Sequence, residues 1–285
     1  MAVEVAPITE TNLSPVARFM HENLNPRVPV EAWASALEVP WTVASPNRGF
    51  MLLDDGALVG AYLAYYSDRV IDGRLEHFCN LGAWCVLEEH RFRGMRLLKA
   101  LLNQPGYHFT DLSPSGNVIG LNKRLKFEIL DTSTALVPNL PWPSVPRRCR
   151  ITSDPRALLN TLTGSDLAIY RDHRTTAAAR HLLMTSGDEH CYVILRRDRR
   201  KGLPVFASIL HVGNPDLFRR FSRELSRHIL FHHGALGTLA ELRVVGGRPT
   251  LSMMLGKPRP KMFKSPTLTC DRIDYLYSEL TCLPW

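Results

Sequence analysis

The sequence predicts an α/β protein made of two domains. Three observations support this: a length of 285 residues, a segment at 81–102 that changes from strand-like to helix-like, and a proline-rich stretch after residue 137. The length suits two domains of ordinary size. Hydrophobic residues make up 45% of the chain and charged residues 22%, as in globular proteins. The chain therefore has enough apolar residues for two packed cores.

The first half alternates helical and strand patterns. Two amphipathic stretches precede two apolar runs that meet at Asp55-Gly56, and Asp-Gly between apolar runs is a strong hairpin signal. A further strand leads into the segment at 81–102. We expect helices at Leu13–His21 and Val30–Leu37 and strands at Phe50–Leu53, Leu58–Tyr66 and Arg74–Phe78.

The segment at 81–102 predicts a buried strand, a tight turn and an amphipathic helix. Leu81–Leu87 is an apolar run of strand length, and Leu97, Leu98, Leu101 and Leu102 fall on one helical face. In the turn between them, Gly94 lets the backbone approach a ligand and adopt dihedrals that a Cβ would forbid. Backbone N–H groups at a helix start favour an anion such as a pyrophosphate. The turn is therefore a candidate coenzyme site.

Three arginines, Arg91, Arg93 and Arg96, lie in this turn. Positive charge at a helix N-terminus opposes the helix dipole, at a cost of a few tenths of a kcal/mol for each residue unless an anion is present. A bound polyphosphate would offset that cost. The arginines thus favour an anionic ligand independently of the glycine.

The turn Arg91-Phe92-Arg93-Gly94-Met95-Arg96 resembles the R/Q-x-x-G-x-G/A loop of the GNAT superfamily of acyl-CoA N-acyltransferases. Downstream, Tyr107–Leu112 is expected to form the next strand, and Ser115–Phe127 aligns without gaps to the family's following helix. The resemblance covers roughly residues 5–140. It implies a mixed, mostly antiparallel central sheet flanked by helices, with acetyl-CoA or another acyl-CoA as co-substrate and no metal.

Three positions depart from the family's pattern. The last loop position, usually glycine or alanine, is Arg96, and the family's helix ending Tyr-x-x-x-Gly-Phe has Asn122 and Lys126 in place of the tyrosine and glycine. The Arg96 side chain can point toward the phosphates or away from them. Asn122 cannot donate a proton to a leaving thiolate as the family's tyrosine is thought to do. These departures affect catalysis more than coenzyme binding.

The resemblance assigns candidate residues to two tasks. Backbone groups of the central strand would hold the pantetheine arm and polarise the thioester carbonyl. A proton acceptor is harder to assign, because the family's catalytic glutamate position is Asn80, which can only orient a water; Glu76 and His77 lie upstream and could act directly or through water. The coenzyme-binding candidates are Trp84, Cys85, Val86, Arg91, Phe92, Arg93, Gly94, Met95, Arg96 and Leu97, and the catalytic candidates are Glu76, His77, Asn80 and Asn122.

A domain boundary is expected in the stretch from Pro138 to Pro146, where four prolines exclude a helix or a central strand. We therefore predict a coenzyme-binding domain at 1–140, a linker at 141–150 and a second domain at 151–285. In the second half the same order of elements returns more faintly. We expect helices at Asp154–Leu162, Arg174–Met184 and Asp216–His232, a hairpin within 191–212, and strands at Leu239–Val245 and Thr250–Leu255.

The second half has no R-x-x-G-x-G pattern. Its equivalent segment, Val212-Gly213-Asn214-Pro215-Asp216, instead predicts an ordinary helix cap by Asn214 with Pro215 at the first helical position. We interpret this half as a degenerate GNAT-like domain. An unrelated α+β domain is the alternative, because this order of elements is common.

The net positive charge lies in the second half, where residues 150–285 hold 21 Lys and Arg against 12 Asp and Glu. The basic residues are expected at a hairpin tip, Arg196–Lys201, and on one helix face. Such charge is usually a solvated surface, or it attracts an acidic ligand. Aromatic residues are not interleaved with it as single-strand binders require, so we do not expect nucleic acid as a partner. The helix-face residues are Arg219, Arg220, Arg223 and Arg227.

The remaining composition indicates a reduced, soluble protein. The six cysteines form no Cys-x-x-Cys pair, so neither a zinc site nor a disulfide framework is indicated, and Cys79 and Cys85 are expected as buried apolar residues. The pair His232-His233 is expected to interact with a helix end rather than with a metal. There is neither an apolar run of about 20 residues nor a leader-like N-terminus, so a cytoplasmic location and no membrane partner are expected.

Together these observations predict a GNAT-type N-acyltransferase, an enzyme that transfers acyl groups other than aminoacyl groups. An acetyl group is the expected cargo and a small-molecule amine the expected acceptor, which would attack the thioester directly in a ternary complex. The alternative is a catalytically silent GNAT-like binding protein, consistent with Asn80, Asn122 and Lys126. A homo-oligomer is left open, because no segment indicates an interface.

Overall fold

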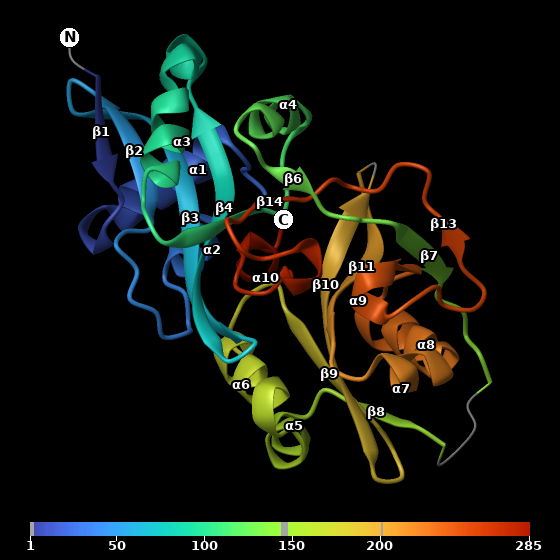
Figure 1. Ribbon diagram of the computed structural model, residues 1–285. Coiled ribbons are helices and arrows are strands. Elements are labelled where there is room, and N and C mark those ends of the chain that lie inside the picture. The colour runs from blue at the N-terminus through green and yellow to red at the C-terminus, as the bar shows by residue number, and fades with distance from the viewer. Residues whose placement is uncertain (1–2, 144–147, 201) are drawn as a thin grey trace. The chain divides into compact units, whose positions relative to one another are not determined.

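The structure, a computed structural model, describes residues 3–143, 148–200 and 202–285. It divides into two units, each with its own seven-stranded mixed sheet (Figure 1). The first unit runs to Leu130 and also contains Pro260–Ile273 and Tyr277–Trp285. The second contains Asp131–Arg259 and Asp274–Leu276. The chain thus forms two units, but each includes segments from distant parts of the sequence.

The first unit has the strand order β1-β2-β3-β4-β5-β14-β6, with β4 and β5 parallel and the other neighbours antiparallel. Its strands are β1 (Val3–Pro7), β2 (Gly49–Asp54), β3 (Ala57–Ile71), β4 (Arg74–Val86), β5 (Tyr107–Asp111), β6 (Glu128–Ile129) and β14 (Met262–Lys264). Its α-helices are α1 (Leu13–Asn23), α2 (Val30–Leu37), α3 (Met95–Leu102), α4 (Gly116–Arg124) and α10 (Glu279–Cys282), and its 3₁₀ helices are η1 (Glu10–Asn12), η2 (Glu88–Arg93) and η3 (Cys270–Arg272).

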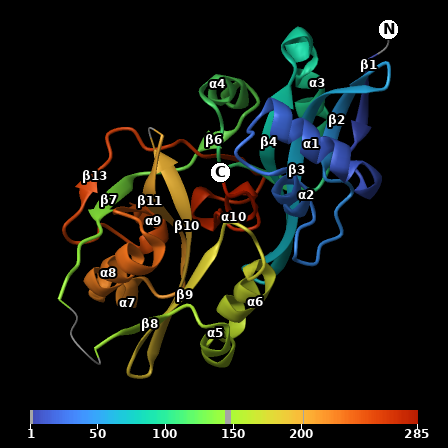
Figure 2. The same ribbon diagram turned by 180° about the vertical axis from the view of Figure 1, so that it is seen from behind.

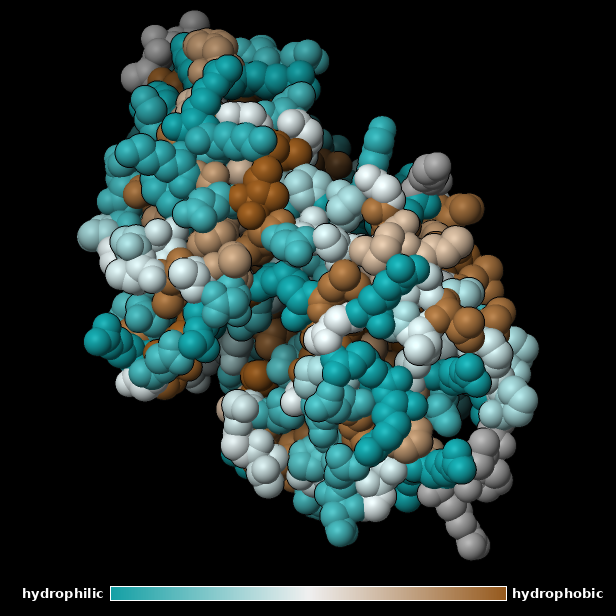
Figure 3. Space-filling model, turned by 45° about the vertical axis from the view of Figure 1, so that its right-hand side comes forward, coloured by the Kyte–Doolittle hydropathy of each residue, from teal (hydrophilic) through white to brown (hydrophobic). Residues whose placement is uncertain are grey.

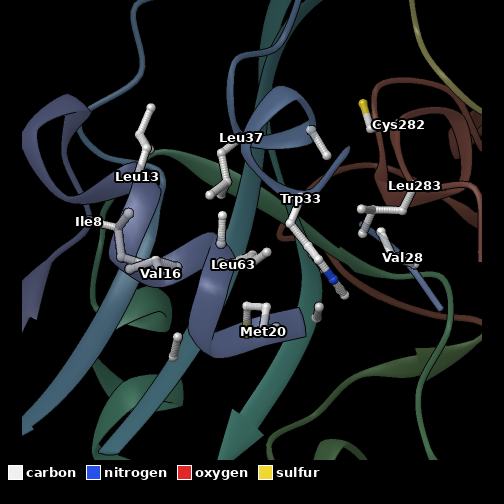
Figure 4. Packing of buried hydrophobic residues seen from close by; sticks show 14 of the residues in the cluster. Ile8, Leu13, Val16, Met20, Val28, Trp33, Leu37, Leu63, Cys282 and Leu283 are labelled. Atoms are coloured by element: carbon white, nitrogen blue, oxygen red, sulfur yellow. The ribbon is translucent and has the colours of Figure 1, made fainter. Parts of the chain in front are cut away.

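Helices cover both faces of this sheet, with α1 and α2 on one face and α3 on the other (Figures 1 and 2). The α1/α2 face packs around Trp33, and it also buries Cys282 and Leu283 from the C-terminal segment (Figure 4). Of the four α3 leucines that were expected to face the sheet, Leu97, Leu98 and Leu101 are fully buried and Leu102 is half-buried. The C-terminal segment is therefore a part of the first core.

Two Asp-Gly turns connect the long central strands to their neighbours. Asp55 and Gly56, which join β2 to β3, have φ values of 49° and 82°, as the expected hairpin requires. A second pair, Asp72 and Gly73, joins β3 to β4 with φ values of 50° and 79°. Strand β4 is continuous, so the two separate strands expected at Arg74–Phe78 and Leu81–Leu87 are one element.

The second unit repeats the first in topology, with the strand order β8-β9-β10-β11-β12-β7-β13 and one parallel pair, β11 with β12. Its strands are β7 (Thr134–Pro138), β8 (Arg150–Thr152), β9 (Arg180–Ser186), β10 (Glu189–Arg200), β11 (Leu203–Val212), β12 (Gly237–Glu241) and β13 (Met253–Met254). Its helices are α5 (Pro155–Thr161), α6 (Gly164–His173), α7 (Pro215–Arg220), α8 (Ser222–His233) and α9 (Leu242–Val245).

In each sheet, the sixth strand in the strand order comes from the half of the sequence that forms most of the other sheet. Strand β7 follows β6 in the chain but pairs with β12 in the second sheet, and β14 follows β13 but pairs with β5 and β6 in the first. The predicted boundaries at 140 and 151 therefore need correction, because an apolar strand pattern does not say which sheet the strand joins. Residues 144–147 of the predicted linker lie outside the described residues.

Three second-half elements also differ from expectation. The helix expected at Arg174–Met184 is wrong: β9 begins at Arg180, β8 and β10 pair with its two edges, and Leu182 and Met184 are buried in the core of the second unit. The strand expected at Leu239–Val245 ends at Glu241 and continues as α9. The helix expected at Asp216–His232 is interrupted at Phe221, between α7 and α8.

The surface is mostly polar on the face that Figure 3 shows, with apolar residues scattered among charged ones. In the described ranges, the helices fall short of the length and apolarity that a bilayer crossing requires.

Candidate functional site

Strands β4 and β5 diverge in the middle of the first sheet. Their pairing runs from His77 with Tyr107 to Asn80 with Thr110, and within the described residues β4 then continues with β3 alone. A β-bulge follows at once, because Leu63 of β3 stands opposite both Gly82 and Ala83. N–H and C=O groups on the free edge of β4 are therefore available to a ligand between the strand ends.

The bulge requires its glycine. A Cβ on Gly82 would lie 2.5 Å from the ring of Tyr65, which is fully buried in the α1/α2 core. A side chain at this position would displace either the ring or the strand. The shape of β4 at the divergence is therefore tied to the packing of the core.

The turn after β4 consists of η2 followed directly by α3. Gly94 connects them with φ −55° and ψ −31°, which is ordinary helical geometry. The freedom of glycine to adopt unusual dihedrals is therefore not used at this position. Its missing side chain matters for packing instead, because a Cβ would lie 3.2 Å from Val86 Cγ2 and 3.4 Å from the Trp84 ring. The glycine lets the turn lie against the diverging part of β4.

The start of α3 presents backbone donors. The amide of Gly94 donates to Arg91 O at 3.1 Å and that of Leu97 to Gly94 O at 3.0 Å. Among the described backbone hydrogen bonds, none is donated by the amides of Met95 and Arg96, in the first turn of α3. These two amides are therefore candidate donors to an anion.

The arginines of the turn have different surroundings. Arg96 donates to the carbonyl of Val3 at 2.6 Å, so its side chain is directed at β1. Arg91 lies 3.4 Å from Glu88 with both side chains largely exposed, and the Arg93 guanidinium lies 5.1 Å from the ring of exposed Phe92. Arg91 is therefore exposed and Arg93 half-buried, whereas the guanidinium of the exposed Arg96 is bound to the backbone of β1.

The predicted strand residues line the same region. Trp84 stacks on Tyr62 with ring centroids 4.7 Å apart, and in the described residues its buried Nε1 has no hydrogen-bond partner. Burial raises the pKa of the Cys85 thiol to about 11, although the charge of Arg91 opposes this, so Cys85 is a neutral thiol at pH 7. The expectation of a buried, unreactive cysteine fits this environment.

Glu76 and His77 lie upstream of the divergence and are engaged in other contacts. The Glu76 carboxylate lies 2.9 Å from Nε2 of buried His108, whose Nδ1 lies 2.8 Å from Ser265 Oγ. His77 Nδ1 lies 2.7 Å from Asp68 on the opposite, more exposed face. Neither side chain is part of the polar cluster at the strand ends.

That cluster forms around Asn80, at the point of divergence. Its amide nitrogen donates to the carboxylate of Glu279, and its carbonyl oxygen accepts from Thr110 Oγ1 at 2.9 Å. The other Glu279 oxygen accepts from Ser113 Oγ at 2.6 Å. Asn80, Thr110 and Glu279 are all buried. The cluster around Asn80 therefore contains a carboxylate, that of Glu279, although the sequence of β4 provides only an amide at this position.

Sequence reasoning missed Glu279, which is 199 positions from Asn80 in the chain. It opens α10, a helix capped by Ser278 Oγ, which accepts from the amide of Leu280 at 3.2 Å. The burial of Cys282 and Leu283 in the first core holds this helix in place (Figure 4). A serine cap before an apolar run could have indicated the helix, but no local signal indicates its burial.

Asn122 lies beside a second buried carboxyl group. Its amide nitrogen donates to Asp111 at 2.8 Å, and in the described part of the chain its carbonyl oxygen is buried without a partner. Burial and the nearby charge of Glu279 raise the pKa of Asp111 to about 7, although hydrogen bonds from Asn122 and Ser113 oppose the shift. The structure thus brings Asn80 and Asn122 together around two carboxyl groups.

The equivalent place in the second unit is built differently. Strands β11 and β12 pair only from Phe206 to Ser208, but the following turn is short, and Asn214 caps six-residue α7 by accepting from the Leu217 amide at 3.0 Å. Glu241 at the end of β12 accepts from the Tyr275 hydroxyl. The expected cap by Asn214 is confirmed, and this turn differs from that of the first unit.

Basic residues of the second unit are largely engaged with neighbouring groups. Arg219 pairs with Asp216, Arg220 pairs with Glu189, and Arg223 lies over Trp142. At the hairpin tip, Asp198 pairs with Arg259, which lies outside the hairpin, at 2.7 Å. Lys201 of the tip lies outside the described residues. Helix α8 ends at His233, where His228 and His232 stack at 4.2 Å. The described residues contain no group of three or more side chains suited to a metal ion.

Comparison with known protein families and with curated proteins finds no match to the sequence. Solved structures do match. A probable N-acyltransferase from Enterococcus faecalis has a TM-score of 0.59 at 12% identity over 92% of this chain and 72% of its own. A GCN5-related N-acetyltransferase from Anabaena variabilis has a TM-score of 0.56 at 10% identity over 92% and 72%. A putative acetyltransferase from Pyrococcus horikoshii has a TM-score of 0.52 at 14% identity over 93% and 90%.

These matches span both units at low sequence identity. The chain therefore has the GCN5-related N-acetyltransferase fold in a tandem arrangement, with one mixed sheet flanked by helices in each unit. This agrees with the fold that the resemblance of the first half implied.

Proposed function

We propose that the protein is an N-acyltransferase that moves an acyl group, most simply acetyl, from coenzyme A to an amine. The observation that carries the proposal is the divergence of β4 from β5 beside the start of α3. The strand edge offers backbone groups to an extended chain, and the helix start offers amides to an anion. An acyl-CoA has both an extended chain and an anion, because its pantetheine arm ends in a pyrophosphate.

The residues of the turn fit this co-substrate. The Met95 and Arg96 amides would hold the pyrophosphate, with Arg91 and Arg93 adding accessible positive charge and Gly94 and Leu97 placing the turn. Phe92 is exposed, so its ring is free to contact the coenzyme. The edge of β4 at Trp84, Cys85 and Val86 would hold the thioester arm. The coenzyme supplies the activated acyl group, and this chain supplies its binding and orientation.

The acceptor amine would approach from the polar cluster at the strand ends. Asn80 would act there as a positioning residue that fixes the Glu279 carboxylate. Glu76 and His77 stay candidates only through an intervening water, because their own partners are His108 and Asp68. The short, Asn214-capped turn of the second unit supports placing the coenzyme in the first unit.

A catalytically silent binding protein is the second candidate. The observation that favours it is Asn122, which occupies the family's tyrosine position and whose amide donates to Asp111. Such a protein would still bind the coenzyme. Turnover of a thioester, rather than binding, therefore separates the two functions.

Thermal unfolding with and without saturating acetyl-CoA tests coenzyme binding. A ligand that binds only the native state stabilises it by about 2.7 kcal/mol at one hundred times its dissociation constant, a shift of several degrees. Gly94→Glu should abolish this shift, because it places a carboxylate against the phosphate site.

Two controls separate charge from packing. Gly94→Ala adds the same Cβ near Val86 without a charge and should keep a reduced shift. Gly256→Glu introduces the same side chain in the second unit, where nothing lies within 4 Å of the added Cβ, and should keep the full shift. A shift that persists in Gly94→Glu would place the coenzyme elsewhere, and no shift with any acyl-CoA would exclude the acyltransferase.

A further inference from the structure

A line of three hydrogen-bonded side chains crosses the first sheet near the beginning of β5. His108, in β5, lies between Glu76 of β4 and Ser265, which directly follows β14. Its Nδ1 lies 2.8 Å from Ser265 Oγ, and its Nε2 lies 2.9 Å from the Glu76 carboxylate. All three residues belong to the first unit. A hydroxyl, an imidazole and a carboxylate are therefore connected, although they come from separate parts of the sequence.

The other contacts of Ser265 determine which atoms carry the protons. Ser265 Oγ accepts hydrogen bonds from the backbone amides of Thr267, at 3.1 Å, and Leu268, at 2.6 Å. These two bonds use both lone pairs of the hydroxyl, so its hydrogen is left for His108. In this contact Nδ1 is therefore the acceptor, and Nε2 carries the hydrogen that is donated to Glu76.

The imidazole is held in the interior, whereas the serine lies nearer to solvent. The His108 side chain is 5% exposed, and the ring of buried Phe78 lies 5.1 Å from it between ring centroids. Ser265 is half-buried and is followed by the exposed residues Pro266 and Thr267. A substrate can therefore approach the hydroxyl from solvent while the base behind it keeps one orientation.

These are the relations that define a nucleophilic triad. A serine is activated when a histidine accepts its proton, and the histidine is oriented when a carboxylate accepts from its other nitrogen. Such triads occur on unrelated folds and are recognised by these roles rather than by their order in the chain. When His108 takes the proton, Ser265 Oγ gains a free lone pair, and the two amides that it binds stabilise its negative charge.

The triad is a different site from the divergence of β4 and β5. Glu76 precedes Asn80, the point of divergence, by four residues, which is about 13 Å along an extended strand. The turn at Gly94 and its amides, which support coenzyme binding, are not part of the triad. An activity of the triad is therefore independent of the acyl transfer proposed above.

We propose that Ser265, His108 and Glu76 form a second catalytic site, which hydrolyses a carboxylic ester through an acyl-serine. Ser265 Oγ forms a bond to the ester carbonyl carbon, its proton passes to His108 Nδ1, and the carbon–oxygen bond to the alcohol breaks. The alcohol leaves with that proton. Water then attacks the acyl carbon and gives a proton to His108, which returns it to Ser265 Oγ as the acid leaves. Glu76 orients the imidazole throughout.

The contacts of the nucleophile favour an ester over an amide as the substrate. The amides of Thr267 and Leu268 bind Ser265 Oγ itself and thus stabilise the nucleophile. The carbonyl group must then be reactive by its own chemistry, as that of an ester is in comparison with that of an amide.

A fluorophosphonate probe tests the nucleophile directly. An activated serine oxygen forms a bond to the phosphorus of the probe, fluoride leaves, and peptide mapping by mass spectrometry locates the product. We expect phosphonylation of Ser265, at a rate that falls by about 10²-fold or more in His108→Gln because the base is lost. Ser208→Ala is the control: this serine donates to the Asp198 carboxylate and not to a histidine, so its loss should leave the rate unchanged.

Ser265→Cys keeps the test independent of a loss of folding. It retains a nucleophile, and iodoacetamide should alkylate the introduced thiol faster than in the double variant with His108→Gln, because the imidazole promotes thiolate formation. Peptide mapping separates this thiol from the six native cysteines. Equal rates of alkylation in the two folded variants would show that His108 does not act as the base.

Hydrolysis of p-nitrophenyl acetate tests the complete reaction. We expect p-nitrophenol to be released in a burst with acetylation of Ser265, followed by slower turnover, and both should be lost in Ser265→Ala. A folded protein in which Ser265 is not phosphonylated would overturn the proposal. Hydrolysis that persists in Ser265→Ala, or phosphonylation without any hydrolysis, would equally exclude an esterase at this site.

Discussion

At the scale of residues, the site differs from its sequence prediction mainly in two carboxyl groups. The spacing of the turn and strand identified Gly94 and the β4 edge, because these residues are adjacent in sequence. Asp111 and Glu279 carry no comparable local signal, since their significance arises from burial near each other. The amides Asn80 and Asn122, which suggested lost chemistry when taken alone, are the groups that bind these carboxyl groups.

Replacing Asp111 by Asn should stabilise the protein at high pH. The pKa of Asp111 rises from 3.8 to about 7 on folding, so the unfolded chain loses this proton at lower pH than the folded chain does. Folding stability therefore falls as pH rises from about 4 to 7, by an amount on the order of 4 kcal/mol. Asp111→Asn removes this loss while keeping an acceptor for Asn122. Urea unfolding should show a gain above pH 7 that vanishes near pH 4.

Asp198→Asn provides a matched control of opposite sign. Burial opposes ionisation of Asp198, but the Arg259 charge and the Ser208 hydrogen bond outweigh it and lower its pKa. Its stabilisation is present above the unfolded pKa and is lost as pH falls through the folded one. Asp198→Asn should therefore destabilise at neutral pH. A gain in both variants, or in neither, would contradict the assignment for Asp111.

At the scale of elements, the first-half helices and hairpins follow from local pattern. Helix α2 spans the expected Val30–Leu37, and Asp55-Gly56 forms the expected turn. Prediction failed where pairing decides the structure. The apolar run in β9 suits a helix until its two neighbouring strands are known, and β7 and β14 could not be assigned to a sheet from alternation alone.

Lys126 follows α4 with φ 64°, in the left-handed region where the family has glycine. The element thus keeps the glycine conformation with a lysine, at a cost of roughly 1 kcal/mol. Lys126→Gly should be neutral or stabilising by up to about 1 kcal/mol, because relief of this strain is partly offset by the entropy of the unfolded glycine. Denaturant unfolding measures the change.

Lys126→Ala serves as the comparison. Alanine has a Cβ and keeps the strain, so it should not reproduce the gain. If Lys126→Gly lost as much stability as Lys126→Ala, the lysine side chain would stabilise the fold, and backbone strain at this position would not be the dominant effect.

At the scale of the whole molecule, the chain is a tandem repeat in which each sheet has received one strand from the other part of the sequence. The repeat was visible in the order of elements, but the exchange was not. The exchange also explains how the C-terminal segment reaches the first unit: after β14 pairs with β5, the chain continues to α10 and brings Glu279 to Asn80. The site of the first unit is thus completed by the last residues of the chain.

The most direct test of this account is acetyl-CoA turnover with a panel of amines, followed as thiol release and acylated product. We expect the unaltered protein to acylate at least one amine, and Gly94→Glu to abolish this turnover, because it places a carboxylate against the proposed phosphate site. Asp131→Asn, at an exposed position, should leave the rate unchanged. Coenzyme binding with no acylation of any amine would contradict the enzyme and favour the silent binding protein.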